Sequence, residues 1–404
     1  MTALGAPVQR LLAAAAPSHG QHRRLLGPVP DLTGQQIREL ARDAGLTGRG
    51  GAGFPTVRKL AAVAAGGRAV VIANGAEGEP ASSKDRLLLS RAPHLVLDGV
   101  ALAARATGAT RAYLYAPADL VERVLAMALE QRHDPVPVEA IRASGTFLAG
   151  QETAAVASVE GRAAIPRSVP PAVFASGVHG RPTLVQNVET LAHLGLLARY
   201  GPAWFRSIGT EGEPGSRLLT VSGAVLRPGV YEAAAGDTLG AALRLAGGVA
   251  GAVQAVLVGG YHGGWVPWLP ETAGLRLTRP ALAPYDAAPG AGVLIALPRR
   301  SCGLAAAGGI AAYLAGENAG QCGPCRNGLP TLAAHLRALS AGRPTPALVH
   351  EIRRVAGLVD GRGACAHPTG TVRLVRSTLR AFAADVEQHL AGRCLAADWD
   401  RRSR

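Results

Sequence analysis

Lysine is nearly absent from this chain of 404 residues. Lysine and arginine together number 42, and only Lys59 and Lys84 are lysines. Aromatic residues are also scarce at 4%, too few to interleave with the arginines and stack on the bases of a nucleic acid. We therefore expect no nucleic acid among the partners, and we expect a geometric reason for an ammonium group at two particular places.

Long apolar runs are missing as well. The longest charge-free candidates, 251–270 and 301–316, are broken by glycine and proline or are shorter than the roughly 20 residues that a span requires. The alanine-rich stretch 11–16 lacks the basic lead of a signal peptide. The five cysteines form an odd set, three of them at metal-like spacing. We expect a cytoplasmic protein with no transmembrane segment, associated with membranes only through partners.

Acidic residues are too few to balance the basic ones, and the net charge is +14. This excess favours acidic partners, nucleotides or anionic surfaces. The hydrophobic share of 48% and the charged share of 17% are typical of a globular protein. The length allows two or three domains with cores of their own.

Glycine is abundant in one short stretch, residues 47–59. Four glycines occupy the six positions from Gly48 to Gly53, the others being Gly50 and Gly51. Such a run permits positive φ angles and lets backbone N–H groups approach a ligand closely. Arg49 and Lys59 bracket it with positive charge. We interpret the stretch as a phosphate-cradling loop and not as a mobile linker.

A second polar stretch, residues 73–86, directly follows the apolar strand predicted at 70–73. It holds the amide of Asn74, the carboxylates of Glu77 and Glu79, and the ammonium of Lys84. Ligands of open α/β sheets bind beyond the ends of such strands. We therefore expect a site here, with both lysines acting as compact donors at a phosphate or flavin edge.

Helical and strand patterns alternate in the first half of the chain, which predicts a parallel sheet covered by helices. The first 30 residues lack a period and are expected to form a loosely held lead-in. Four helices with short connections predict a bundle near the C-terminus. The predicted helices are 31–45, 94–107, 120–131, 186–197, 238–246, 304–314, 329–339, 348–358 and 371–390, and the predicted strands are 70–73, 112–115, 218–222, 229–232, 255–259 and 293–297.

Four motifs occur in a familiar order and spacing: Gly48–Lys59, Asn74–Arg86, Gly150-Gln-Glu-Thr and Gln186-Asn-Val-Glu-Thr. In this the chain resembles the 51-kDa flavoprotein subunit of NADH-quinone oxidoreductase, respiratory complex I, and its relatives in NAD-linked hydrogenases and formate dehydrogenases. The resemblance implies an α/β fold with a Rossmann-like flavin-binding domain at 31–210 after the lead-in 1–30. It further implies a small β-grasp, ubiquitin-like domain at 215–298 and a C-terminal four-helix bundle at 303–395 that holds an iron-sulfur cluster.

The resemblance also implies FMN as cofactor and NADH as substrate. Glu77 and Glu79 would orient the ribose or nicotinamide as catalytic residues, and Phe54 would form an aromatic wall for NADH. The implied cofactor-binding residues are Gly48, Arg49, Gly50, Gly51, Gly53, Phe54, Lys59, Asn74, Gly150, Glu152, Asn187 and Thr190. The chain departs from the family at Ala76 and Gln151, where the family has acids, and at Ala62, where it has a second aromatic residue.

The family holds a [4Fe-4S] cluster with C-x-x-C-x-x-C and a fourth cysteine about 40 residues later. Here the second, third and fourth positions are Cys322, Cys325 and Cys365, but the first is Ala319. Four interpretations follow. The first is an iron-sulfur cluster on three cysteines, either [3Fe-4S] or [4Fe-4S] with an outside ligand such as His367. The others are zinc bound by the three cysteines and His367, a C-x-x-C redox centre, and a vestigial site that holds nothing. We expect Cys302 and Cys394 to be ordinary buried or surface thiols, with Cys302 as a further candidate for a substitute ligand.

These features together predict a flavoprotein oxidoreductase module of the NADH dehydrogenase type. Electrons would pass from NADH through FMN and the cluster to a thioredoxin-like [2Fe-2S] subunit or a ferredoxin. The alternative is a non-catalytic flavin-binding electron-transfer or assembly module that has lost NADH oxidation. The losses at Ala76, Gln151, Ala62 and Ala319 favour that alternative, whereas the intact glycine loop favours the enzyme.

Overall fold

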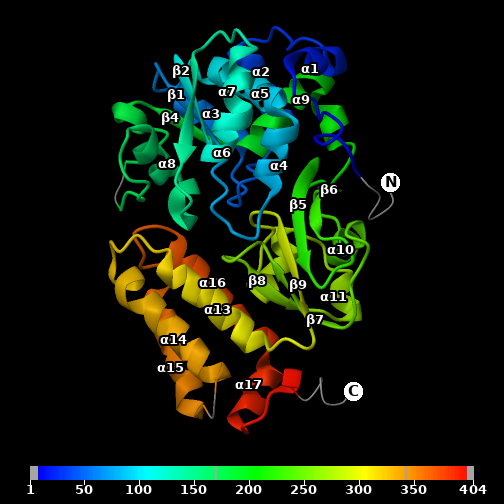
Figure 1. Cartoon of the computed structure of the whole chain (residues 1–404). Coiled ribbons are helices and arrows are strands. Elements are labelled where there is room, and N and C mark those ends of the chain that lie inside the picture. The colour runs from blue at the N-terminus through cyan, green and yellow to red at the C-terminus, as the bar shows by residue number, and fades with distance from the viewer. Residues whose placement is uncertain (1–7, 169–170, 342–343, 398–404) are drawn as a thin grey trace. The chain divides into compact units, whose positions relative to one another are not determined.

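The computed structural model describes residues 8–168, 171–341 and 344–397, and it divides into two compact units (Figure 1). Unit 1 comprises residues 1–219 and 230–237, and unit 2 comprises residues 220–229 and 238–404. The boundary between them falls within strands β5 (Ser216–Gly223) and β6 (Gly229–Ala234).

Unit 1 is built on a four-stranded parallel sheet in the order β3-β2-β1-β4. The strands are β1 (Val70–Asn74), β2 (Arg111–Pro117), β3 (Val138–Ala143) and β4 (Thr183–Asn187). In register, Ile72 of β1 lies opposite Tyr113 on one side and Val185 on the other. This parallel sheet with helices confirms the predicted α/β class.

Helices cover both faces of this sheet. Val71 and Ala73 of β1 belong to one apolar core together with Leu95, whereas Val70 and Ile72 belong to a second core. This alternation follows the two-residue period of a strand whose faces are both buried. The helices of unit 1 are α1 (His19–Leu26), α2 (Gly34–Asp43), α3 (Thr56–Ala64), α4 (Lys84–Arg91), α5 (Pro93–Thr107), α6 (Ala118–Leu120), α7 (Ala126–Glu130), α8 (Glu152–Val159) and α9 (Val188–Arg206).

The first residues of two predicted helices of unit 1 are set in different ways. Thr33 begins α2 with a reciprocal cap, in which its hydroxyl accepts from the amide of Gln36. The helix predicted at 186–197 begins two residues later, because Gln186 and Asn187 form the end of β4. Neither β4 nor β3 was predicted from the sequence.

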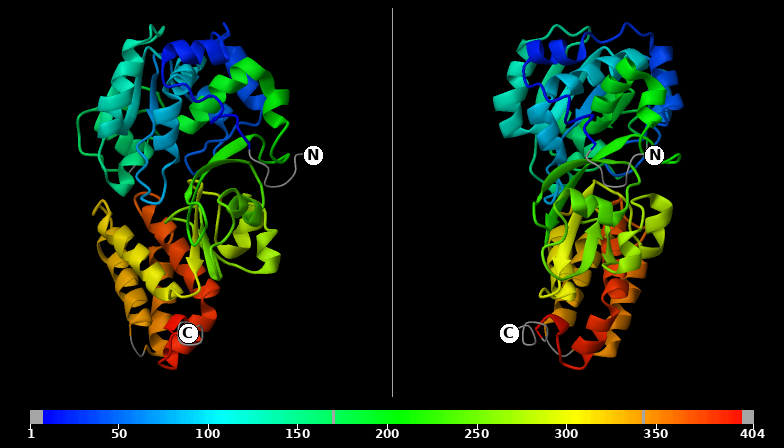
Figure 2. Two further views of the ribbon diagram at one scale, coloured as in Figure 1. Left: turned by 45° about the vertical axis from the view of Figure 1, so that its right-hand side comes forward. Right: turned by 90° about the vertical axis from the view of Figure 1, so that its right-hand side faces the viewer.

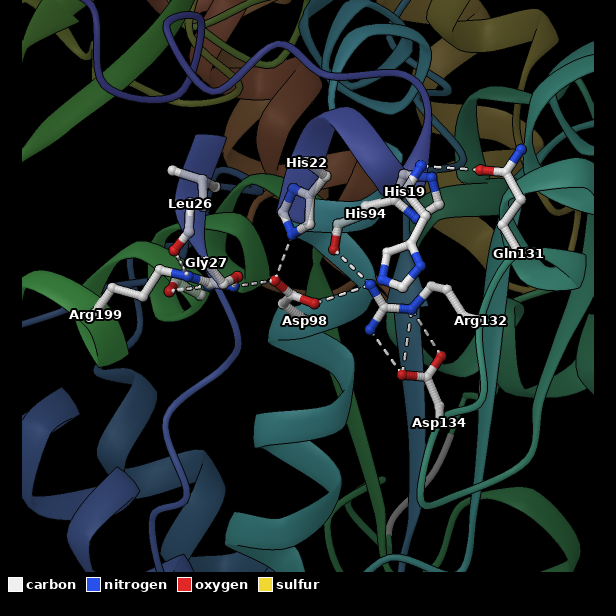
Figure 3. A network of polar contacts seen from close by, with 11 residues as sticks. His19, His22, Leu26, Gly27, His94, Asp98, Gln131, Arg132, Asp134 and Arg199 are labelled. Atoms are coloured by element: carbon white, nitrogen blue, oxygen red, sulfur yellow. Dashed lines mark hydrogen bonds and ion pairs between the residues drawn. The ribbon is translucent and has the colours of Figure 1, made fainter. Parts of the chain in front are cut away.

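The N-terminal segment is anchored, so the expectation of a loose lead-in is wrong for residues 8–30. His22 of α1 lies 2.7 Å from Asp98 of α5, which also pairs with Arg132 and Arg199 at 2.8 and 2.6 Å (Figure 3). Burial opposes ionisation, but the hydrogen bond from His22 and the two arginine charges lower the pKa of Asp98 to about 2.

In unit 2, β9 (Val293–Pro298) pairs in parallel with the second half of β5 and antiparallel with β7 (Val253–Val258). The β8 strand (Gly264–Pro267), which was not predicted, pairs antiparallel with β7. Three short helices accompany these strands: α10 (Leu239–Leu245), α11 (Pro270–Ala273) and α12 (Arg279–Leu282).

Five helices end unit 2: α13 (Gly303–Gly316), α14 (Leu329–Ser340), α15 (Pro346–Val359), α16 (His367–Ala381) and α17 (Ala383–Leu390). Helix α14 packs against α13 and α15, and α16 packs against α13 and α15 (Figure 2). The single helix predicted at 371–390 is wrong, because Phe382 leaves the helical conformation with φ −112° and ψ 33° and separates α16 from α17.

Within the described ranges, no single helix is long and apolar enough to cross a membrane. Helices α4 and α5 reach that length and composition only as a pair, which is bent by 95°.

Candidate functional site

The carboxyl edge of the sheet of unit 1 contains a reversal of strand order. From β1 the chain adds β2 and β3 on one side and then returns to place β4 on the other side. The last residues of β1 and of its neighbour β4, Asn74 and Asn187, lie opposite each other in register. Loops diverge at such a switch point and leave room for a ligand outside the strand ends.

Both asparagines organise the backbone around this edge. The Oδ1 of Asn187 accepts from the amide of Glu189 at 3.0 Å and so caps α9. Its Nδ2 donates to Asp85 at 2.7 Å, which holds the start of α4 nearby. The Nδ2 of Asn74 donates to the carbonyl of Gly150 at 2.8 Å. The structure therefore brings together three stretches that the sequence singled out.

The glycine loop lies against the N-terminus of α9. The amide of Arg49 donates to the Thr190 hydroxyl at 2.9 Å. A Cβ atom on Gly50 would lie 3.2 Å from the Cβ of Asn187, so a side chain there would crowd the contact. Gly51 and Gly53 have φ angles of 115° and 63°, which favour glycine. The loop is thus an ordered turn whose bare backbone faces the switch point.

The guanidinium of Arg49 does not face solvent or a ligand. It donates to the hydroxyl of Thr47 and to the carbonyl of Pro214, each at 2.9 Å, and the residue is 3% exposed. Burial lowers the pKa of Arg49 to about 10. The side chain holds the loop in place, whereas the backbone of the same residue contacts Thr190.

Lys59 and Glu152 form an ion pair at the switch point. The Nζ of Lys59 also lies 3.3 Å from the carbonyl of Val185 on β4. The two side chains are 25% and 45% exposed, so both remain within reach of a ligand. The neighbouring Gln151 uses its Oε1 to cap α8, accepting from the amides of Thr153 and Ala154 at 2.7 and 3.1 Å. The side-chain oxygen of Gln151, which stands where the family has an acid, is therefore used in hydrogen bonds within the protein.

Glu77 caps the start of α4. Its carboxylate accepts from the hydroxyl of Ser82 at 2.7 Å and from the amides of Asp85 and Arg86 at 2.9 Å each. Its φ of 46° is unusual for a residue with a side chain. Glu79 accepts a long bond of 3.4 Å from the amide of Ala81. Glu77 thus shapes the loop in which both predicted catalytic carboxylates lie.

Lys84 is buried in an ion triad and does not serve as a ligand donor, contrary to our expectation. Its Nζ lies 2.7 Å from Asp85 and 2.9 Å from Glu189. Burial would lower the pKa of Lys84, but the two carboxylates raise it above its ordinary value. Burial raises the pKa of Asp85 to about 6. Because Asp85 also accepts a hydrogen bond from Asn187, the triad helps to fix the position of Asn187 at the switch point.

An exposed aromatic side chain stands beside the glycine loop. Phe54 is 44% exposed and is one of several large hydrophobic side chains exposed among the described residues. Ala62 is partly exposed on α3, where the related family places a second aromatic residue. Ala76, in place of a family acid, is buried. The structure thus leaves one aromatic face available to a planar ligand.

In unit 2, Cys322 and Cys325 of the segment between α13 and α14 lie close to Cys365, which precedes α16. Burial and the thiols of Cys322 and Cys365 raise the pKa of Cys325 to about 12. Burial opposes ionisation of Cys322, but the amides of Ala364 and Cys325 lower its pKa. The amide of Ala319 lies beside the thiol of Cys325. The donor set is therefore three thiols with backbone N–H groups around them, as an iron-sulfur cluster requires.

His367 is not the missing ligand, which corrects two of our interpretations. Its Nε2 donates to the carbonyl of Leu314 at 2.8 Å, so its Nδ1 is the acceptor for the Nε2 of His262 at 3.0 Å. With both ring nitrogens occupied, neither an outside cluster ligand nor a Cys₃His zinc site can use this side chain.

Cys302 is not a substitute ligand either. It precedes α13, whereas the cysteine loop follows α13, and a helix of 14 residues is about 21 Å long. The structure instead groups Cys302 with His389 and Cys394, a pair that the sequence did not single out.

Two family models match the chain. Residues 41–195 match the Nuo51 FMN-binding domain, and residues 305–389 match the NADH-ubiquinone oxidoreductase-F iron-sulfur binding region. Together they cover the switch point in unit 1 and the cysteine loop in unit 2.

Curated relatives and solved structures agree with these matches. The chain is 32% identical over 394 residues to the NADH-quinone oxidoreductase F 2 subunit of Rhizobium meliloti (strain 1021), covering 93% of each chain. It is 29% identical to the NADH-quinone oxidoreductase F subunit of Escherichia coli (strain K12), covering 91% of this chain and 86% of the relative. An NAD⁺-reducing [NiFe]-hydrogenase in the H2-reduced state superimposes with a TM-score of 0.81 at 31% identity, covering 93% of this chain and 67% of that one.

Proposed function

The chain belongs to the family of NADH-quinone oxidoreductase F subunits, and from this premise we propose that it oxidises NADH and delivers the electrons to a partner carrier. Bound FMN would supply the chemistry, accepting a hydride from NADH and releasing single electrons to an iron-sulfur cluster. The protein supplies binding, orientation and an exit for the electrons. Neither the family matches nor the relatives favour a module that has lost this activity.

The contact between the glycine loop and the N-terminus of α9 at the switch point carries this proposal. Gly48, Gly50, Gly51 and Gly53 leave the backbone bare on the side where the strand order reverses. Asn187 caps α9 and Thr190 lies in its first turn, whose amides attract an anion. A phosphate group and a planar ring both fit this combination of donors and exposed backbone.

The residues around the loop would divide the remaining work. We assign Lys59, Asn74, Gly150 and Glu152 to the polar edge of the flavin, since Lys59 and Glu152 are paired and partly exposed there. Lys59 would place its positive charge where negative charge develops, a form of electrostatic stabilisation. The backbone of Arg49 would belong to the cradle, because its guanidinium is engaged elsewhere.

The nicotinamide would lie against the exposed face of Phe54. Stacking on one aromatic ring contributes about 1 kcal/mol beyond area burial. Glu79 would orient the ribose or nicotinamide, as would the loop backbone that Glu77 holds by capping α4. The acids missing at Ala76 and Gln151 reduce the negative charge near the flavin.

The cysteine loop would hold the cluster that receives the electrons. Cys322, Cys325 and Cys365 supply three thiolates, and Ala319 and His367 supply none. We therefore propose a cluster with three protein ligands, either [3Fe-4S] or [4Fe-4S] with a non-protein ligand on its fourth iron.

The wider organisation follows from the same family. We propose the flavin-binding domain at 31–210, a β-grasp domain at 215–298 and a helical iron-sulfur domain at 303–395, after the segment 1–30. A thioredoxin-like [2Fe-2S] subunit or a ferredoxin would accept the electrons, and the net charge of +14 suits an acidic carrier. We place the protein in the cytoplasm, attached to a membrane only through partners.

Neighbouring cations on α3 provide a direct test of the flavin site. In Lys59→Met the flavin loses its cationic donor, and we expect FMN affinity to fall at least about tenfold, because a hydrogen bond to a charged group contributes about 1.5–3 kcal/mol. The matched control is Arg58→Met, which removes an exposed cation one residue away. FMN binding would be measured by quenching of flavin fluorescence. Equal affinities in the two variants would contradict the assignment.

A further inference from the structure

A second group of metal-ligand side chains lies in unit 2, apart from the cysteine loop. The Sγ atoms of Cys302 and Cys394 and a ring nitrogen of His389 all lie within 4.8 Å of one another. Cys302 directly precedes α13, His389 lies in the last turn of α17, and Cys394 follows that helix. Three parts of the chain thus meet at one point.

Local structure explains how Cys302 reaches α17. A Cβ atom on Gly303 would lie 2.3 Å from the ring of Phe382, so only glycine permits this approach of α13 to the break between α16 and α17. The start of α13 therefore packs against the break that precedes α17. Helix α17 has only eight residues, so His389 in its last turn is not far from this contact.

A tight turn returns Cys394 to the same place. After α17 the chain adopts a left-handed conformation at Gly392, with φ 73°, and the amide of Gly392 donates to the carbonyl of His389 at 2.9 Å. The amide of Arg393 then donates to the carbonyl of Gln388 at 2.8 Å. These bonds reverse the chain and bring Cys394 back beside His389.

The distances match those of ligands around one ion. Zinc binds thiolate sulfur at about 2.3 Å and imidazole nitrogen at about 2.0–2.1 Å, so in a tetrahedral site the two ligand atoms are about 3.6 Å apart. The Sγ of Cys302 lies 3.4 Å from the Nε2 of His389. Two thiolates and an imidazole form a soft to borderline donor set, which suits zinc better than magnesium or calcium.

The surroundings hold the ligand groups in place. His389 is 4% exposed, so the imidazole is held in the interior, and Asp385 lies buried one helical turn before it. The amides of Leu304 and Ala305 at the start of α13 lie beside the Sγ of Cys302. Backbone N–H groups of this kind are typical outer-shell partners of metal-bound thiolates.

We propose that Cys302, His389 and Cys394 bind one zinc ion, with solvent in the fourth position, at a site separate from the iron-sulfur cluster. The ion would tie the start of α13 to the chain that follows α17. Because the folded state alone presents the three ligands together, zinc would stabilise the end of unit 2 by mass action.

Cobalt binding tests the site without interference from the cluster. The full chain with Cys322, Cys325 and Cys365 all replaced by serine has only Cys302 and Cys394 left as thiols. Titration with Co²⁺ is expected to produce thiolate charge-transfer absorption and tetrahedral d–d bands that saturate at about one equivalent and disappear on addition of Zn²⁺. Adding Cys394→Ser should weaken binding more than about 100-fold, since even outer-shell changes cost about 10–100-fold. An unchanged titration, or no thiolate absorption, would overturn the proposal.

Metal analysis of the unaltered chain provides the second measurement. Zinc by elemental analysis is expected at about one per chain, and it should be lost in Cys394→Ser and in His389→Gln while iron and flavin stay constant. The alternative states of the same thiols are a Cys302–Cys394 disulfide and a metal-free thiol pair. Mass spectrometry showing that disulfide in zinc-free protein, or equal zinc contents in the parent chain and both variants, would overturn the proposal.

Discussion

Replacing Lys84 with methionine tests whether this lysine is structural or binds the cofactor. Methionine keeps an unbranched apolar stem but leaves Asp85 and Glu189 buried without their shared cation. Removing one partner of a buried ion pair costs about 3–5 kcal/mol, which is a large part of the 5–15 kcal/mol that stabilises a typical domain. We therefore expect the free energy of unfolding of the variant to fall by about that amount.

The loss should depend on pH in a definite direction. Burial already raises the pKa of Asp85 to about 6, from 3.8, and loss of Lys84 raises it further. A folded-state pKa above the unfolded value means that the folded protein retains a proton while the unfolded one releases it, so stability falls as pH rises through this window. The cost of Lys84→Met should therefore be larger at pH 8 than at pH 5, where Asp85 can be neutral.

The assay is urea denaturation followed by circular dichroism, with FMN binding measured on the folded protein. Arg86→Met is the matched control, because Arg86 lies on the same helix and its ion pair with Asp119 leaves both side chains 47% exposed. Exposed pairs contribute about 0–1 kcal/mol. If Lys84→Met unfolded at the same urea concentration as the control but lost FMN affinity, Lys84 would be a ligand donor and our reasoning would be refuted.

Two further predictions concern the pH response and the cluster. Burial and the charge of Arg132 lower the pKa of His94 from 6.5 to about 4. Between these pH values the imidazole binds a proton in the unfolded state but not in the folded state. The free energy of unfolding therefore falls by roughly 2–3 kcal/mol as the pH falls. In His94→Gln the urea midpoints measured from pH 7 to pH 4.5 should lose this part of the slope, and parallel curves would contradict it. Ala319→Cys places a fourth thiol beside Cys325, and iron and sulfide analysis should then approach four of each per chain, with the matching change in the electron paramagnetic resonance spectrum. An electron paramagnetic resonance spectrum identical to that of the parent chain would show that the loop cannot present residue 319 to the cluster, whereas iron content alone does not decide this if the parent cluster already holds four irons.

Much of the fold was predictable because local patterns carry it. The apolar run of β1 and the period of α5 agree with the predicted elements to within one residue. Thr33, a residue type favoured at helix N-termini, caps α2. By contrast, β4 was hidden, since Gln186 and Asn187 resemble the polar residues before a helix although they pair with β1. Pairing partners distant in sequence decided that assignment, and a local pattern does not contain them.

The candidate site was predictable in its membership more than in its roles. The glycine loop, Asn74, Asn187 and Thr190 do come together. The roles of the charged residues depend on burial, and the sequence alone does not show which way a charged side chain faces. Lys84, for example, points into the protein. The group of Cys302, His389 and Cys394 was missed because 87 residues separate its first two members. The spacing of His389 and Cys394 was the one local signal.

One measurement tests the central claim most directly: the absorption spectrum of the purified full chain under anaerobic conditions, recorded before and after addition of NADH, with flavin and iron quantified on the same sample. The account predicts bound FMN whose absorption bleaches on addition of NADH, together with about three or four iron atoms per chain. Bound FMN that stays oxidised in excess NADH, or protein that binds neither flavin nor iron, would contradict it.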